Sequence, residues 1–187
     1  AYNPEVKFYE YDLDLAKSLL AEAGYPDGFE TTIYTISRDN DTAVALQAAL
    51  SQIGIQAEVE TLDNSVMAAM QKEDNMQGII IGKGAGQMDF TNNYIRLYSS
   101  EGIKNQGIML FPEDYEEALF GARAAKTLDE KKTLLQKASK LMVEDYALLF
   151  PMSVLYNYSF SQKGLQDVGM YEMSLTQWTP EAMYWEQ

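Results

Sequence analysis

Segments with strand patterns and segments with helix patterns alternate between residues 29 and 82, and this alternation limits the possible folds more than any other feature. Residues 29–37 are rich in Thr, Ile and Tyr, which favours a strand. Residues 55–61 alternate apolar and polar side chains, the period of a strand with one wet face. Helix patterns fill the intervening residues. The order strand, helix, strand, helix, strand predicts right-handed crossovers and a sheet that is at least partly parallel.

The third strand of this series is the short segment Gly78–Gly82, whose three consecutive isoleucines predict burial on both faces. A glycine-rich loop, residues 83–89, follows it at once. In open α/β sheets, ligands bind beyond the carboxyl ends of the strands because helices cover the two faces. We therefore expect a binding site at this loop, although glycines that only turn the chain would give the same pattern.

Helix patterns also occur before and after the alternating region. One covers residues 12–23 with Asp12 as its cap, a second begins at Pro112, and a third begins with the capping-box pair Thr127 and Glu130. The expected buried faces are Ala16, Leu19, Leu20 and Ala23 in the first helix, Tyr115, Ala118, Leu119 and Ala122 in the second, and Leu134, Ala138, Leu141 and Met142 in the third. A short helix after residue 62 should turn Val66, Met67 and Met70 inward, and an edge strand is expected within residues 147–156.

Composition excludes several classes of function. The chain has no cysteine and no histidine, which removes Ser-His-Asp and Cys-His catalysis and the usual zinc sites. Its formal net charge of −14 argues against binding to nucleic acid or to an anionic membrane surface. No apolar run approaches the roughly 20 residues that cross a bilayer. The first residues lack a signal-peptide pattern, so any export signal is expected to lie outside this chain.

Motifs for phosphate, calcium and paired carboxylates are incomplete. Gly82-Lys83-Gly84 lacks the first glycine and the final Ser or Thr of a Walker A motif. Asp39-Asn40-Asp41 lacks the glycine and the glutamate of a calcium loop, and is interpreted as a solvated helix cap. The acidic residues within 113–117 could supply a glycosidase pair, but the start of a helix favours negative charge in any case. We expect no catalytic residues, no metal and no cofactor.

The run from Tyr11 to Phe29 resembles the family 5 extracellular solute-binding proteins, which are the peptide- and oligopeptide-binding components of ABC importers. Its most specific part is the helix that ends in Glu-Ala-Gly-Tyr-Pro-Asp-Gly-Phe. Later parts of the family pattern are similar to residues 50–55, 112–113, 144–151 and 163–165. The resemblance spans almost the whole chain, and it matches only the C-terminal lobe of such proteins.

This resemblance implies that residues 1–187 form a single domain, the C-terminal ligand-binding lobe of a two-lobe protein, with an α/β fold in which helices flank a mixed sheet. The implied function is non-catalytic capture of a small solute, with a peptide as the first candidate, by lobes that close like a hinged clamp. The implied partners are this solute, the permease of an ABC transporter and the N-terminal lobe of the same protein. The implied location is the periplasm or the extracellular face of the membrane, with the signal and any lipid anchor outside this chain.

Within such a cleft, the loop and the residues that follow it supply the expected ligand contacts. Backbone N–H groups freed by the glycines could bind a carboxylate, while the carboxylate of Asp89 could bind an amine or a hydroxyl group. The expected contacts are Lys83, Gly84, Gly86, Gln87, Asp89, Asn92 and Asn93. Peptide-binding members of the family carry a tryptophan and an acidic residue after this strand, whereas this chain carries residues 83–90, in which Asp89 is the acid and tryptophan is absent.

Two other classes of function stay open at this point. A carboxylate-based hydrolase would need paired carboxylates that face a pocket, and a protein-interaction module would need a large exposed apolar patch. If the chain is a lobe within a larger protein, both of its crossings to the other lobe should pass through one hinge. We then expect Ala1 and the final residues to lie on one side of the domain, with the loop of residues 83–89 opening toward that side.

Overall fold

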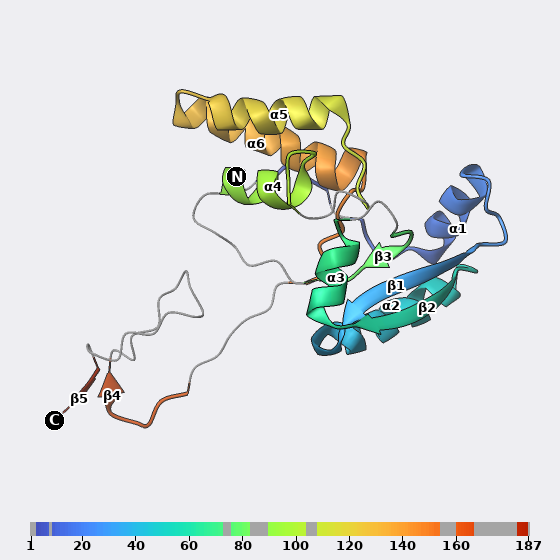
Figure 1. The fold of residues 1–187 in the computed structure, drawn as a ribbon, viewed down its shortest axis with the longest axis horizontal. Helices are drawn as coiled ribbons and strands as arrows, with labels where there is room; N and C mark the ends of the chain where they lie inside the picture. The colour runs from blue at the N-terminus through green and yellow to red at the C-terminus, as the bar shows by residue number, and fades with distance from the viewer. Residues whose placement is uncertain are drawn as a thin grey trace.

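A computed structural model of the chain describes residues 3–7, 9–72, 76–82, 90–103, 108–153, 160–166 and 183–186. Its helices are α1 (Leu13–Glu22), η1 (Ser37–Asp39, a 3₁₀ turn), α2 (Asn40–Ser51), α3 (Asn64–Met70), α4 (Phe90–Tyr98), α5 (Glu113–Ala124), α6 (Leu128–Lys140) and η2 (Leu141–Asp145, a π-helical turn). Its strands are β1 (Glu30–Ile36), β2 (Gln56–Leu62), β3 (Ile79–Ile80), β4 (Leu165–Gln166) and β5 (Tyr184–Trp185). The predicted α/β architecture is therefore confirmed (Figure 1).

The first three strands form a parallel sheet in the order β2-β1-β3. β1 pairs with β2 along its whole length, from Glu30 opposite Gln56 to Ile36 opposite Leu62. The parallel arrangement predicted from the alternating pattern is thus confirmed. The prediction that the third strand is buried on both faces is wrong for two of its three isoleucines, because Ile79 and Ile80 are half-buried, while Ile81 is buried. In the described sheet β1 lies in the middle, so β3 has a paired strand on one side.

One face of this sheet packs against α2. The buried residues there, which we call the sheet cluster, are Ile33, Ala43 and Ile81, with Leu46, Leu50, Ala57, Val59 and Ile79 partly buried around them. The predicted alternation of β2 follows from this packing. Ala57 and Val59 turn toward α2 and are half-buried, while Gln56, Glu58 and Glu60 are exposed.

Helices α4, α5 and α6 pack together with η2 around a second group of buried residues, the helical cluster. Its members are Ile95, Tyr115, Ala118, Leu119, Ala122, Leu135, Ala138, Leu141, Met142 and Val143. All four residues of the buried face predicted for α5 are confirmed. In α6, Leu134 is half-buried and the adjacent Leu135 is buried instead. Burial, with a smaller contribution from Tyr94, raises the pKa of Tyr115, whose hydroxyl donates to the carbonyl oxygen of Tyr98 at 2.7 Å.

Helix α1 begins and ends as predicted but does not bury its apolar face. The N–H of Leu15 donates to Oδ1 of Asp12 at 2.9 Å, and Gly24 follows the helix with a φ of +91°. No residue of α1 is buried, and Leu19 is 49% exposed. The predicted burial is wrong for the described structure because no described element packs closely enough on α1 to cover that face. The same holds for Val66 in α3, which is exposed while its neighbour Met67 is buried.

The C-terminal part departs from the sequence expectations. Residues 147–153 contain no strand, and residues 154–159 lie outside the described part, so the edge strand expected there is absent from the described half. β4 and β5 form an antiparallel pair, with Leu165 opposite Trp185, that Figure 1 shows well apart from the parallel sheet and the helices. The expectation that both chain ends and the loop of residues 83–89 lie on one side of the domain stays a prediction. Ala1, Gln187 and the loop are outside the described residues. No described helix is both long and apolar enough to span a membrane.

Candidate functional site

The carboxyl ends of the three parallel strands lie at one edge of the sheet, and the turns that could hold a ligand begin there. β1 ends at Ile36, β2 ends at Leu62, and β3 is followed by Ile81 and Gly82. The loop of residues 83–89 therefore starts at the same edge as the turns after β1 and β2. This is the edge at which open α/β sheets bind their ligands.

A hollow of about 250 Å³ lies between the turns after β1 and β2. It is lined by Ile36, Ser37, Arg38, Leu62, Asp63 and Asn64. A hydroxyl, a guanidinium, a carboxylate and an amide therefore meet above two apolar side chains. Such a set of groups can bind a small polar molecule through both hydrogen bonds and charge.

Arg38 and Asp39 are the charged pair at this edge. The Nε of Arg38 lies 3.4 Å from Oδ1 of Asp39, and the Arg38 side chain is 61% exposed while that of Asp39 is 1% exposed. The interpretation of Asp39 as a solvated helix cap is wrong, because the 3₁₀ turn η1 places this carboxylate inside the protein and it makes no capping bond to α2. The buried carboxylate of Asp39 therefore pairs with the guanidinium of Arg38, whose side chain stays largely exposed and contributes to the lining of the hollow.

A side-chain hydrogen bond between β2 and the start of α2 lies at the same edge. The hydroxyl of Thr61, near the end of β2, donates to Oδ1 of Asn40 at the start of α2, with a distance of 2.8 Å. This bond joins the turn after β1 to the end of β2. The two turns that line the hollow are therefore held at a fixed separation by side chains that do not themselves line it.

The structure describes two of the seven residues expected to contact ligand. Lys83, Gly84, Gly86, Gln87 and Asp89 lie outside the described residues. Asn92 is exposed on α4, whereas Asn93 is 9% exposed and accepts a hydrogen bond from Nη2 of Arg96 at 3.1 Å. The role of all seven in binding stays a prediction.

Sequence reasoning missed the residues that line the hollow. It predicted a short helix after residue 62, where Asp63 and Asn64 lie, without assigning these two residues to a site, and it did not single out Ser37 or Arg38. The signal that could have found them is their position directly after the two longest predicted strands. Because parallel strands end at one edge, polar residues that follow each of them gather in space.

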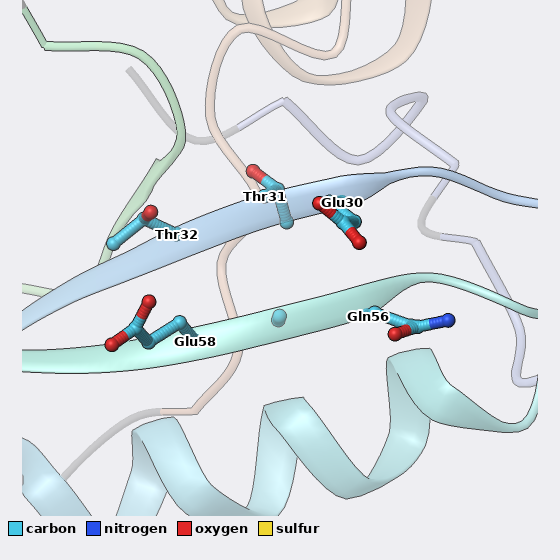
Figure 2. Close-up of a pocket in the computed structure, with 6 residues that line it drawn as sticks. Glu30, Thr31, Thr32, Gln56 and Glu58 are labelled. Atoms are coloured by element: carbon cyan, nitrogen blue, oxygen red, sulfur yellow. The ribbon is translucent and has the colours of Figure 1, made fainter.

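A larger hollow of about 500 Å³ lies along the amino-terminal halves of β1 and β2 and is lined by Glu30, Thr31, Thr32, Gln56, Ala57 and Glu58 (Figure 2). Glu30 pairs with Gln56 and Thr32 with Glu58 on the sheet face opposite α2. This hollow carries two glutamates and no cation, and no turn or helix start contributes to its lining. We therefore place the candidate site at the carboxyl edge and not here, although this hollow is the larger. Among the described residues, no group of three His, Cys, Asp or Glu could hold a metal ion.

Comparisons with known proteins show the family of the chain and support its fold. The sequence model of the bacterial extracellular solute-binding proteins, family 5 Middle, matches residues 1–105. Heme-binding protein A of Haemophilus influenzae is 29% identical over 160 residues, which cover 82% of this chain and 29% of that protein. The glutathione-binding protein GsiB of Escherichia coli K12 is 32% identical over 181 residues, with 88% and 34% covered. The periplasmic binding protein DppA of Helicobacter pylori, solved with the peptide STSA, superposes with a TM-score of 0.71 at 31% identity, over 80% of this chain and 30% of DppA.

The chain belongs to the family 5 bacterial extracellular solute-binding proteins. The resemblance noted in the sequence is therefore confirmed, and the extracellular character of the family confirms the expected location outside the cytoplasm. The likeness to DppA confirms a fold of the periplasmic-binding-protein type. The chain spans about a third of the length of the curated relatives that it matches.

Proposed function

We propose that residues 1–187 form a single ligand-binding lobe, the C-terminal one of two, and that the lobe captures a small solute for an ABC transporter without catalysing a reaction on it. The observation that carries this proposal is the polar hollow at the carboxyl edge of the sheet, where Arg38 presents an open guanidinium. The other half of the cleft would come from the N-terminal lobe of the longer protein. The partner of the closed form would be a membrane permease.

The solute that fits this edge is one with a carboxylate group, and a peptide is the first candidate. A guanidinium binds a carboxylate through two parallel hydrogen bonds, which gives direction as well as energy. Heme, glutathione and the peptide STSA, named with the relatives above, are chemically different, but each carries at least one carboxylate. A family that varies the rest of its cleft could keep this one interaction.

Capture is favoured over hydrolysis by the charges at the edge. A carboxylate-based hydrolase needs two carboxylates that face the same bond. In the described lining of the hollow, Asp63 is the acidic residue, and Asp39 lies behind Arg38 with 1% of its side chain exposed. The guanidinium of Arg38 in the same lining suits an anionic ligand better than an acid and base pair.

Mass spectrometry of small molecules that co-purify with the complete translated polypeptide tests the proposed function. We expect a small molecule with a carboxylate group, recovered unchanged after prolonged incubation with the protein. Recovery of a hydrolysed product, or of a bound macromolecule in place of a small solute, would contradict the proposal.

Replacing Arg38 by alanine is expected to weaken carboxylate binding by about 10- to 100-fold, the usual range for one charged hydrogen-bonding partner. The measurement is titration calorimetry of the complete polypeptide with the peptide Ser-Thr-Ser-Ala and with its C-terminal amide. The unaltered protein should prefer the acid form, and Arg38→Ala should lose this preference. Arg38→Lys should retain part of it, and Lys132→Ala, an exposed site on α6, should retain all of it. An unchanged preference in Arg38→Ala would remove Arg38 from the site.

The 187-residue chain alone is expected to bind solutes weakly. One lobe leaves a solute half in water, so the burial of 70–90% of the ligand surface that is typical of pockets is out of reach. Calorimetry with di- to pentapeptides should show dissociation constants no tighter than roughly 1 mM, about 4 kcal/mol. Micromolar binding would place the whole site within these residues and would contradict the cleft between two lobes.

A further inference from the structure

The described residues contain two separate hydrophobic cores. The sheet cluster belongs to a unit formed by β1, β2 and β3 with α2 and α3, and the helical cluster belongs to a unit formed by α4, α5, α6 and η2. Figure 1 shows these units as two distinct groups, with α4, α5 and α6 together on one side of the sheet unit. The two clusters share no residue. Because each cluster is confined to its own unit, segments that touch both units contribute to their relative position.

Residues 3–12, without residue 8, form a strap that contacts both units. The strap is fixed to the helical unit at several points. The Nδ2 of Asn3 donates to the carbonyl oxygen of Gln136 at 2.9 Å, and Val6 packs against the helical cluster. The backbone N–H of Lys7 donates to Oε2 of Glu144 at 3.3 Å.

The strongest point of the strap is Tyr9, whose hydroxyl donates to the backbone carbonyl of Glu144 at 2.8 Å. Glu144 lies in the π-helical turn η2, one residue before that turn ends. Carbonyl groups at the end of a helix have no partner within the helix, so they need a donor from elsewhere. Tyr9 supplies this donor, and the side chain of Glu144 accepts from Lys7, so a single residue of η2 holds the strap twice.

The far end of the strap contacts the sheet unit. The hydroxyl of Tyr11 donates to Oε1 of Gln52, which directly follows α2, at 3.3 Å. Asp12 then caps α1, and α1 leads through the turn at Gly24 into the central strand β1. The strap therefore runs from the end of the helical unit to the end of α2 and continues into the strand that forms the hollow.

We propose that this strap sets the position of the helical unit against the carboxyl edge of the sheet, and that Tyr9 and Glu144 are positioning residues for solute binding. The helical unit matters for the site because α4 starts at Phe90, eight residues after Gly82 at the sheet edge. A change in the strap moves α4 relative to the hollow without altering any residue that lines it. This inference rests on the proposed function, since it assigns the strap a role in the affinity of the same site.

A distance measurement between the two units tests the strap directly. The chain has no cysteine, so spin labels can be placed at Glu58→Cys on β2 and Lys132→Cys on α6, both exposed. Tyr9→Phe removes the hydroxyl that reaches Glu144 and keeps the ring. Its matched control is Tyr25→Phe, which removes a hydroxyl for which no hydrogen bond is described from a tyrosine of the same exposure, 52%.

We expect Tyr9→Phe to broaden the distribution of distances between the labels and to raise the population of displaced helical units by about fivefold, the effect of one net hydrogen bond on an equilibrium. Glu144→Ala removes the acceptor of the Lys7 N–H and should broaden the distribution as well. Glu144→Gln keeps an acceptor for this N–H, so its distribution should stay close to that of the unaltered chain. Tyr25→Phe should leave the distribution unchanged. If Tyr9→Phe and Tyr25→Phe give the same distribution as the unaltered chain, the strap does not position the units.

The affinity of the complete polypeptide for Ser-Thr-Ser-Ala separates this inference from the proposed function. A positioning role predicts that Tyr9→Phe weakens binding severalfold, while Tyr25→Phe does not. If the distances change and the affinity does not, the strap has only a structural role and the inference is wrong. If the unaltered protein binds no carboxylate-bearing solute, the proposed function fails, whereas the distance measurement still decides whether the strap holds the units.

Discussion

Replacing Gly28 by alanine is expected to lower the free energy of unfolding by about 2–5 kcal/mol. Gly28 has a φ of +82°, in the left-handed region that costs other residues about 1–2 kcal/mol. A Cβ atom at this position would overlap the carbonyl oxygen and carbonyl carbon of Gly54. Backbone cannot move aside as a side chain can, so overpacking of about 1–3 kcal/mol adds to the conformational cost.

Gly24 provides the matched control for this substitution. It has a φ of +91°, but a Cβ atom added there would meet nothing within 4 Å. Gly24→Ala should therefore lose only the conformational part, about 1–2 kcal/mol. Urea unfolding of the unaltered protein, Gly24→Ala and Gly28→Ala is followed by circular dichroism. It gives the loss in free energy of unfolding that each substitution causes. Equal losses in Gly24→Ala and Gly28→Ala would show that the close approach to Gly54 does not contribute.

The contact between Gly28 and Gly54 also explains how the sequence aligns the two long strands. Each glycine lies two positions before the start of a strand, and the N–H of Gln56 donates to the carbonyl oxygen of Phe29 at 2.9 Å just beyond the contact. The close approach fixes where β1 and β2 start side by side. Their carboxyl ends then come level at Ile36 and Leu62, which places the turns of the candidate site next to each other.

Features that depend on neighbouring residues in the sequence were predicted well. The caps at Asp12 and Thr127 need only a side-chain oxygen and an N–H three residues later, and both bonds are present. The buried face of α5 was predicted completely because its partners, α4 and α6, cover it on the side that the helical period selects. The parallel sheet followed from the order of the elements, since a helix between two strands favours a crossover.

Features that depend on distant neighbours were predicted less well. An apolar face on α1 and a run of isoleucines in β3 show that these surfaces avoid water, but they do not show what covers them. The described residues leave Leu19 of α1 half-exposed and place β3 on one side of the sheet, with β1 in the middle. The order of strands across the sheet is set by packing between elements, which local patterns do not encode.

In the candidate site, too, the features set by local sequence were easier to predict than those set by distant residues. The rule that ligands bind beyond parallel strands predicts the same edge of the sheet at which the described hollow lies, but the sequence prediction named the glycine loop and not the turns after β1 and β2. Asp39 began a calcium-loop pattern that is incomplete, Arg38 belonged to no motif, and the burial of Asp39 to 2% exposure depends on the 3₁₀ turn η1. No motif considered in the sequence analysis predicts the 3₁₀ turn η1.

Replacing Leu119 by alanine is expected to lower the free energy of unfolding by about 3–4 kcal/mol. Leu119 is 0% exposed at the centre of the helical cluster, and its removal combines lost apolar burial with a cavity between packed helices. Leu128 is the matched control, because the same substitution at a side chain that is 84% exposed on α6 should change the stability by no more than about 0.5 kcal/mol.

Urea unfolding of Leu119→Ala, monitored separately in the sheet unit and in the helical unit, also tests whether the two units unfold together. If the two hydrophobic clusters unfold as one cooperative body, Leu119→Ala should shift the transitions of both units to the same lower urea concentration. If the strap is the main tie between them, the helical unit should unfold first and the sheet unit should keep its midpoint. A loss in Leu119→Ala as small as in Leu128→Ala would contradict the burial of Leu119 and the packing of α5 against α6 on which the helical unit depends.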